Sequence, residues 1–349
     1  MTDQLIHRIK SAVKILIKGQ PQVIKVEIPP ITDEEVIEAK RFFPLEKFFI
    51  FGHARSGTTL LTRLIRLHPQ VYCNYQAHFF TRPPLLESLV AREEIRTWLA
   101  RPSNRWNRGA DLSPVVLRAA ADFILERDAV LAGKGHQNCI VGDKSPNSLL
   151  GGESIRLMVK VYPDARLLYI VRDGRDAVVS HRFQTFIDRP NQLSSKALKI
   201  RQIFIDNPEP FLNGHQSIFT EEDLIEAAGG WSRNVNETVQ TARKLVGEQF
   251  FTLRYEDMLA KTWDTLQKVW TFLGVDPRID GLQESLTKEM QINPDAKWQQ
   301  QKSPEISDHI EKGQRGTWRE LFTPRDRQIF KQEAGKTLID WGYEKDLDW

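Results

Sequence analysis

A short segment after the first apolar run of the chain combines two glycines, an arginine and three hydroxyl side chains. It reads Gly52-His53-Ala54-Arg55-Ser56-Gly57-Thr58-Thr59. Glycine allows backbone turns that other residues resist, and a helix that starts here points free N–H groups at a bound anion. The glycine spacing is that of a Mg-ATP loop, but Thr58 stands where that loop has lysine, and Arg55 lies inside it. The segment predicts a site for another phosphate-bearing donor; a strand-to-helix turn without a ligand is the alternative.

A second arginine with a following serine repeats this arrangement later in the chain. Arg172 stands at the carboxyl end of a predicted strand, and Ser180 follows about two helical turns further on. A guanidinium fixed at such a point binds phosphate through two hydrogen bonds. The alternative is a salt bridge between Arg172 and Asp173 or Asp176. Taken together, the two segments predict two separate phosphate sites.

The first segment resembles the 5′-phosphosulfate loop of sulfotransferases that use 3′-phosphoadenosine 5′-phosphosulfate (PAPS). Residues 55–59 have the R-S-G-T-T form common in carbohydrate, tyrosyl-protein and many bacterial members. Residues 172–180 resemble the family's 3′-phosphate motif, with Gly174 where the family often has proline. The resemblance implies that the donor is bound by Arg55, Ser56, Gly57, Thr58, Thr59, Arg172 and Ser180.

Two later segments extend the resemblance to about residues 46–320. Residues 253–259 look like the family's R-Y-E-D-L segment, whose tyrosine, Tyr255 here, reaches the nucleotide. Residues 312–318 look like the late K-G-x-x-G-x-W loop that closes over the 3′-phosphate. Glu311 replaces the arginine that cytosolic members have before this loop, so the basic contact is expected from Lys312 or Arg315. The contacts implied for the loop are Lys312, Gly313, Arg315 and Gly316.

The resemblance also implies which cations act on the sulfuryl group. Transfer is an in-line displacement in which PAP leaves with negative charge on its bridging oxygen, and it needs neither a metal ion nor a covalent intermediate. Arg55 is placed to neutralise that oxygen. Residues 142–146 resemble the D-K-T-P segment of bacterial and tyrosyl-protein members, in which Lys144 stabilises charge on the sulfuryl group. A surface lysine paired with Asp143 is the alternative.

The acceptor needs a base, and residues 74–80 resemble the family's E-x-H-F-F segment. Gln76 replaces the usual glutamate and cannot accept a proton, so the role falls to His78, whose ordinary pKa of about 6.5 suits it. A histidine hydrogen-bonded beside two phenylalanines is the alternative. Asp143 and Glu87 are the fallback bases.

These residues follow apolar runs that predict strands. The runs alternate with amphipathic segments, which is typical of a parallel α/β sheet that binds ligands beyond the carboxyl ends of its strands. The expected strands are residues 48–51, 71–74, 139–141, 166–171 and 250–254. We therefore expect an α/β fold with a central parallel sheet flanked by helices, as in P-loop NTPase-like sulfotransferases. The expected organisation is an N-terminal helix and lead-in over residues 1–45, then one domain over residues 46–349. Helical insertions at about 81–135 and 186–229 would wall the acceptor pocket.

Composition limits the partners. The 349 residues carry a formal net charge of +3 without a basic run, which argues against a nucleic-acid face. No apolar run is long enough for a membrane span, and basic residues interrupt any secretory signal. Two cysteines make neither a disulfide framework nor a metal site, so a cytoplasmic location is expected. The N-terminal residues have helical apolar spacing, which predicts packing on the core or on a second subunit of a homodimer, or a basic membrane-surface helix.

The sequence thus predicts a PAPS-dependent sulfotransferase that transfers a sulfuryl group to an acceptor hydroxyl without a metal. The acceptor would be a small molecule, a carbohydrate or a peptide. Two alternatives stay open. One is a P-loop kinase or NTPase with Asp143 as its magnesium ligand. The other is a PAP-binding protein that has lost catalysis, for which Gln76 would be the signature.

Overall fold

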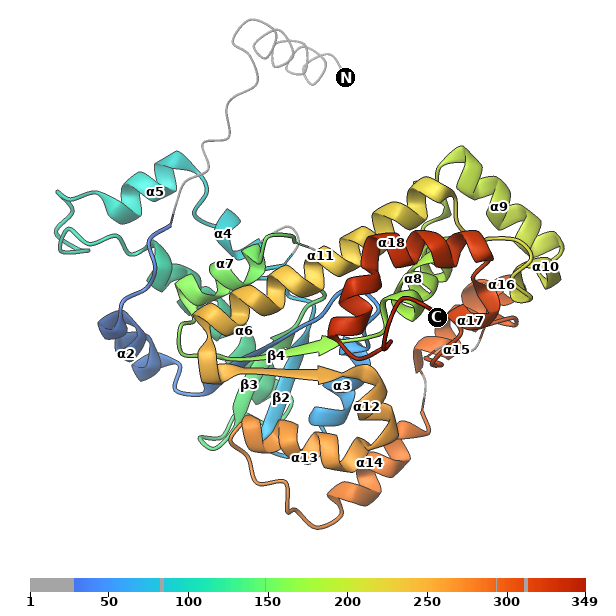
Figure 1. The fold of residues 1–349 in the computed structure, drawn as a ribbon. Helices are drawn as coiled ribbons and strands as arrows, with labels where there is room; N and C mark the ends of the chain where they lie inside the picture. The colour runs from blue at the N-terminus through green and yellow to red at the C-terminus, as the bar shows by residue number, and fades with distance from the viewer. Residues whose placement is uncertain (1–27, 82–84, 148, 293, 311–312) are drawn as a thin grey trace, which may run out of the picture.

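A five-stranded parallel sheet forms the centre of the protein, in the order β2-β3-β1-β4-β5 (Figure 1). The computed structural model describes residues 28–81, 85–147, 149–292, 294–310 and 313–349. The strands are β1 (Glu46–Phe51), β2 (Val71–Tyr75), β3 (Ile140–Lys144), β4 (Arg166–Val171) and β5 (Phe250–Arg254). The predicted parallel α/β sheet is confirmed. The bounds of β4 and β5 are as predicted, whereas β3 starts one residue later than predicted and continues through Asp143 and Lys144.

Helices cover both faces of the sheet because its strands are apolar on both sides. In β1, Phe49 and Phe51 pack on one face, and Phe48 and Ile50 pack on the other. The first face is covered by α6 (Ser113–Leu131), α7 (Glu153–Val161), α8 (Gly174–Asp188), α11 (Glu221–Leu245) and α18 (Pro324–Asp340). The second face is covered by α3 (Thr58–Ile65), α12 (Tyr255–Ala260), α13 (Thr262–Phe272) and α14 (Leu282–Met290) (Figure 1).

Shorter elements surround this three-layer core. They are α2 (Asp33–Phe42), α4 (Leu85–Ser88), α5 (Glu93–Ala100), η1 (Pro190–Gln192), α9 (Ser195–Asp206), α10 (Glu209–Leu212), η2 (Gly247–Gln249), α15 (Pro294–Lys302), α16 (Pro304–Ser307) and α17 (Trp318–Leu321). The expected N-terminal helix falls within residues 1–27, which lie outside the described residues. Helix α2 lies in the segment read as a lead-in. Its signal is a capping box in which Thr32 and Glu35 bond each other's backbone N–H. Over the described ranges, no helix has both the length and the apolarity that a bilayer crossing requires.

The order of the strands decides where the candidate residues meet. From β1 at the centre, the chain builds β2 and β3 on one side and then β4 and β5 on the other. The loop after β1 therefore lies at the switch point, where parallel sheets bind ligands. In the register of the strands, Lys144 lies opposite both Ile50 and Tyr75, and Arg254 lies opposite Val171. The sheet thus gathers the residues that follow all five strands along one edge.

Candidate active site

The loop between β1 and α3 has the backbone geometry of an anion cradle. Ser56 N–H donates to the His53 carbonyl at 3.1 Å, which closes the loop on itself. Arg55 has a φ of 69° and Gly57 a φ of 89°. The left-handed region is costly for arginine, and such strain gathers at functional sites. Gly57 is the N-cap of α3 and provides no side-chain cap, so the first N–H groups of the helix face outward from its end.

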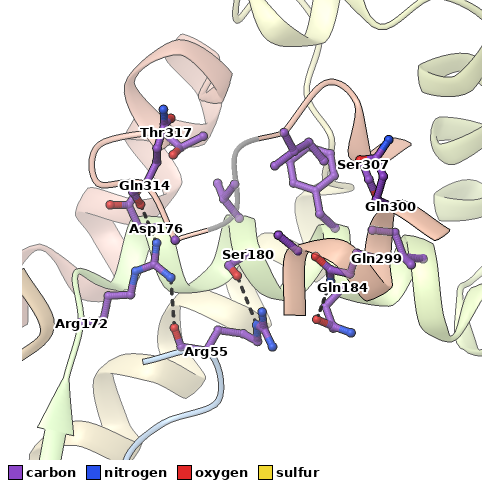
Figure 2. Close-up of a pocket in the computed structure, with 16 residues that line it drawn as sticks. Arg55, Arg172, Asp176, Ser180, Gln184, Gln299, Gln300, Ser307, Gln314 and Thr317 are labelled. Atoms are coloured by element: carbon purple, nitrogen blue, oxygen red, sulfur yellow. Dashed lines mark hydrogen bonds between the residues drawn. The ribbon is translucent and has the colours of Figure 1, made fainter. Parts of the chain in front are cut away.

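Arg172 joins this loop to the segment after β4. Its guanidinium donates to the carbonyl of Arg55 at 3.2 Å and to the carbonyl of Gln314 at 2.8 Å (Figure 2). Arg55 Nε donates to Ser180 Oγ at 3.2 Å. Arg172 also lies over the ring of Tyr255, with 4.8 Å from guanidinium carbon to ring centroid. Arg55, Arg172 and Ser180, which the sequence placed in two phosphate sites, therefore form one connected cluster together with Tyr255.

Two buried polar atoms in this cluster have no hydrogen-bond partner among the described residues. They are Ser56 Oγ and Arg172 Nε. Buried polar groups in native proteins are almost always hydrogen-bonded, so an unpaired hydroxyl and an unpaired guanidinium N–H call for a ligand or water. Because Arg172 carries a positive charge, a phosphate oxygen is a fitting partner for its N–H.

A cavity of about 320 Å³ opens over the loop, and we call it the central cavity. It is lined by Arg55, Gly57, Thr58, Thr59, Arg172, Ser180, Tyr255 and Gly313 among the predicted residues. It runs from Gln76 and Pro146, after β2 and β3, to apolar side chains near β5 and α14, which are Leu259, Met290 and Ile292. Its polar middle suits phosphates, and its apolar end suits a nucleobase. A smaller cavity of about 90 Å³ lies beside it, against Arg55 and Ser180 (Figure 2).

The late loop returns to this cluster. Asp176, near the start of α8, accepts from the N–H of Gly316 at 2.7 Å and of Trp318 at 3.3 Å. Tyr255 Oη donates to the carbonyl of Gly313 at 3.0 Å. Arg315 is exposed and is not among the residues that line the central cavity. Lys312 lies outside the described residues. Sequence reasoning missed Asp176 as the anchor of the loop, because only the fold brings it to that backbone.

Lys144 is buried, so it is not the surface lysine of the alternative interpretation. Its ammonium group donates to Thr59 Oγ1 at 3.3 Å and lies 5.0 Å from the centroid of the Tyr75 ring. The ammonium group is thereby held beside the first turn of α3. It brings a second positive charge, in addition to Arg55, to the hydroxyl end of the loop.

Gln76 and His78 both lie in the loop after β2, but they have different surroundings. Both residues have positive φ, 57° and 52°, and the loop is tied to β3 by Gln76 N–H, which donates to the Lys144 carbonyl at 2.7 Å. Gln76 lines the central cavity. His78 Nδ1 instead lies 2.9 Å from Thr81 Oγ1, and His78 is not among the described residues that line the central cavity. Asp143 and Glu87 also lie outside that lining.

Asp143 of β3 is hydrogen-bonded to the same loop. Its carboxylate accepts from Ala77 N–H at 3.0 Å and from Ser145 Oγ at 2.6 Å. Burial raises the pKa of Asp143 to about 6, while these hydrogen bonds and Lys144 act in the opposite direction. Its two oxygens are occupied by groups of the protein. In the described ranges, no group of three or more His, Cys, Asp or Glu side chains is arranged to hold a metal ion.

The raised pKa of Asp143 makes folding stability fall as pH rises. The folded state prefers the protonated carboxyl, so this stabilisation is complete below the unfolded pKa of 3.8 and is lost as pH passes through about 6. The full change is about 3 kcal/mol. Asp143→Asn cannot ionise; its Oδ1 can still accept from Ala77 N–H, while its Nδ2 would donate to Ser145 Oγ instead of accepting from it. In urea unfolding at pH 5 and pH 8, we expect the wild type to lose more stability than the variant between the two pH values; equal losses would contradict the assignment.

A family model described as "Sulfotransferase family" matches residues 47–280. A protein-tyrosine sulfotransferase of Drosophila melanogaster is 31% identical over 46% of this chain and 29% of its own length. Protein-tyrosine sulfotransferase A of Caenorhabditis elegans is 30% identical over 38% of this chain and 32% of its own length. The matches thus span about a third of each relative.

Solved structures of low sequence identity were also found. A mouse sulfotransferase complexed with PAP is 18% identical, with a TM-score of 0.46 over 89% of this chain and 92% of the mouse chain. A sulfotransferase from Alicyclobacillus acidocaldarius is 19% identical, with a TM-score of 0.40 over 78% of this chain and 98% of that chain.

Proposed function

Because this chain belongs to the sulfotransferase family, we propose that it transfers a sulfuryl group from PAPS to an acceptor hydroxyl by metal-independent in-line displacement. One observation carries the proposal. Arg172, Arg55 and Ser180 are joined in one hydrogen-bonded cluster on a cavity that also takes in the N-terminus of α3. A donor with phosphate groups on both the 3′ and the 5′ position needs two anion sites on one nucleotide, and the cluster offers both.

In this proposal different residues bind different parts of the donor. The 5′-phosphosulfate is bound by Ser56, Gly57, Thr58 and Thr59 at the start of α3, where free N–H groups and the helix dipole favour an anion. The 3′-phosphate is bound by Arg172 and Ser180. The late loop, with Gly313, Gly316 and either Lys312 or Arg315, closes over it, and Tyr255 borders the adenosine.

The cations are proposed to act where charge develops. As the bond from sulfur to the bridging oxygen breaks, its electron pair stays on the phosphate oxygen of PAP. Arg55 lines the central cavity, and Lys144 donates to the hydroxyl of Thr59, which also lines it. Fixed charges in a site that excludes water stabilise such an oxygen strongly. His78, the base predicted from the sequence, stays a proposal that is tested in the next subsection against a second histidine.

The kinase alternative explains less of the site. A kinase would leave Arg172 and Ser180, each bonded to Arg55, without a role. The carboxylate of Asp143 is already bonded to Ala77 and Ser145. The inactive PAP-binding alternative differs only in turnover, because Gln76 lines the cavity where the family usually has a glutamate. A measurement of ligand binding distinguishes the proposed sulfotransferase from the kinase. A measurement of PAPS consumption distinguishes it from the inactive PAP-binding protein.

The direct test is calorimetric titration of the purified protein with PAP, AMP and Mg-ATP. We expect PAP to bind at least about 100-fold more tightly than AMP, because charged hydrogen bonds to the 3′-phosphate contribute about 1.5–3 kcal/mol each. Equal affinity for PAP and AMP would remove the second phosphate site. Preference for Mg-ATP would favour the kinase.

Metal removal gives a second prediction. Arginine, lysine and helix N–H groups supply all the positive charge in the proposed mechanism, so prolonged treatment with EDTA should leave both PAP binding and PAPS consumption unchanged. The measurement is PAP formation before and after dialysis against the chelator, with a Mg²⁺-dependent kinase as a positive control. Loss of turnover that Mg²⁺ restores would contradict this mechanism.

We propose a reducing compartment, the cytoplasm, for this chain. Its cysteines support this: Cys73 and Cys139 are both free and buried. The acceptor is proposed to be a hydroxyl compound among small molecules, carbohydrates and peptides.

A further inference from the structure

A second large cavity lies against the other side of the loop after β1, and we call it the side cavity. Its volume is about 400 Å³, larger than that of the central cavity. His53 and Ala54 of the loop, several residues of α8 and α11, and the N-terminal end of α9 line it. Ala54 lines both the side cavity and the central cavity, so the two cavities border the same residue of the loop. A molecule in the side cavity is therefore next to the loop that is proposed to hold the sulfuryl group.

One of two adjacent glycines in the middle of α11 borders this cavity. Gly229 and Gly230 lie well inside a helix of 25 residues, where each glycine costs about 1 kcal/mol relative to alanine. Gly230 lines the side cavity, and a Cβ placed on it would have no described atom within 4 Å. Packing therefore does not require a glycine at position 230. The missing side chain leaves space in the side cavity.

The bond to Ala54 fixes the tautomer of the His53 ring. Its Nδ1 lies 3.1 Å from the Ala54 carbonyl oxygen, and because a carbonyl can only accept, Nδ1 carries the proton. Nε2 of the neutral ring is then the nitrogen that can accept a proton. This is the tautomer that a general base for a hydroxyl group needs.

The surroundings keep this ring neutral. Burial lowers the pKa of His53 to about 4; the bond to Ala54 opposes the shift, and nearby His181 adds to it. The ring is therefore neutral at physiological pH, and it is a weaker base than a histidine with the ordinary pKa of about 6.5. Other charged groups on the cavity are Arg182 of α8 and Asp223 and Glu226 of α11. Arg182 and Asp223 form an ion pair of 2.6 Å. The lining thus offers carboxylate, guanidinium, hydroxyl and amide groups, the last two from Thr185 and Gln192, beside apolar side chains such as Leu193 and Phe219.

We propose that the side cavity binds the acceptor, that the acceptor is polyhydroxylated like a sugar, and that His53 Nε2 takes the proton of the reacting hydroxyl. The acceptor oxygen forms the new bond to sulfur, and its proton moves to Nε2. The bond from sulfur to the bridging oxygen breaks, and the electron pair stays on PAP beside Arg55. The inference rests on the proposed function and assigns the base to His53 instead of His78.

The first test uses water as the acceptor, so no unknown compound is needed. Hydrolysis of PAPS to PAP and sulfate is followed in the wild type, His53→Asn and His78→Gln. Asparagine keeps an N–H near the Nδ1 position for the Ala54 carbonyl but has no base. We expect the rate to fall at least 30-fold in His53→Asn and to stay within 3-fold in His78→Gln. The reverse pattern would return the role to His78, and a wild type that binds PAP but leaves PAPS intact would contradict a poised base.

PAP affinity separates this inference from the proposed function. We expect equal PAP dissociation constants for all three proteins, because His53 does not line the central cavity. A wild type that does not bind PAP would overturn the proposed function itself. If PAP binds and only the hydrolysis pattern differs from expectation, the inference about His53 alone is overturned.

The second test fills the side cavity. Gly230→Phe places a ring in the cavity, while Gly230→Ala adds only a methyl group at the same position. The probes are methyl β-glucoside and 4-nitrophenol, with PAP formation above the hydrolysis rate as readout. We expect glucoside transfer in the wild type, a loss of at least 10-fold in Gly230→Phe, and little change in Gly230→Ala. Transfer to 4-nitrophenol alone, or no transfer to either probe, would overturn the sugar-like class, and equal transfer by Gly230→Phe would overturn the cavity.

Discussion

Replacing Arg172 by alanine is expected to weaken PAP binding by at least about 100-fold, because the 3′-phosphate then loses its charged partner, worth about 3 kcal/mol. The guanidinium also fastens two loops, since it donates to the carbonyls of Arg55 and Gln314. Its removal therefore frees the late loop as well. Calorimetric titration with PAP measures the effect, and circular dichroism confirms that the variant is folded.

Two further variants make this result specific. Arg172→Lys keeps the charge but cannot bind phosphate through a fork of two N–H groups, so we expect an intermediate loss of affinity. Arg278→Ala removes a largely exposed arginine that is paired only with Asp276, and it should leave PAP affinity unchanged. AMP lacks the 3′-phosphate, so its affinity should change far less than that of PAP in Arg172→Ala. Equal losses for AMP and PAP would show that Arg172 acts on the loops and not on the 3′-phosphate.

Gly57→Ala is expected to impair both folding and binding. Gly57 has a φ of 89°, and an added Cβ would overlap the ring of Tyr255. The left-handed conformation costs alanine about 1 kcal/mol, and the clash adds about 1–3 kcal/mol. Because relief of the clash must move either the start of α3 or Tyr255, we also expect PAP affinity to fall at least about 10-fold.

Gly133→Ala is the matched control. Its φ of 72° imposes a similar conformational cost, but an added Cβ would have no described atom within 4 Å. Chemical denaturation should show a loss of about 1 kcal/mol for Gly133→Ala and at least twice that for Gly57→Ala. PAP affinity should change only in Gly57→Ala. Equal losses of stability would mean that Tyr255 yields to the methyl group without cost.

Much of the fold follows from local patterns in the sequence. Residues 166–171 and 250–254 are short apolar runs bounded by turns, and both are strands with those bounds. Helix α2 was missed because its neighbouring prolines suggested an irregular segment, although Thr32 and Glu35 carry a capping box. Strand β3 was misplaced because Gly142-Asp143-Lys144 has no apolar pattern; burial by neighbouring strands, not propensity, makes it a strand.

Most residues proposed for the donor site were also accessible from the sequence, because they follow the carboxyl end of a strand. In a parallel sheet those ends share one edge, so Arg55, Arg172 and Tyr255 had to come near one another. The family expectation carried by these residues is confirmed by the match over residues 47–280. Their individual roles stay predictions until the variants above are measured.

The sequence by itself determined the class of this protein, because strand pattern, glycine spacing and the position of each arginine are local properties. Tertiary structure alone decided which way side chains point and which distant segments of the chain come to lie beside the central cavity. The positive φ of Gln76 and His78 puts Gln76 on the central cavity and His78 against Thr81. The packing of α8 and α11 around His53 opens the side cavity. Such contacts depend on the summed geometry of the layers, which no short stretch of sequence encodes.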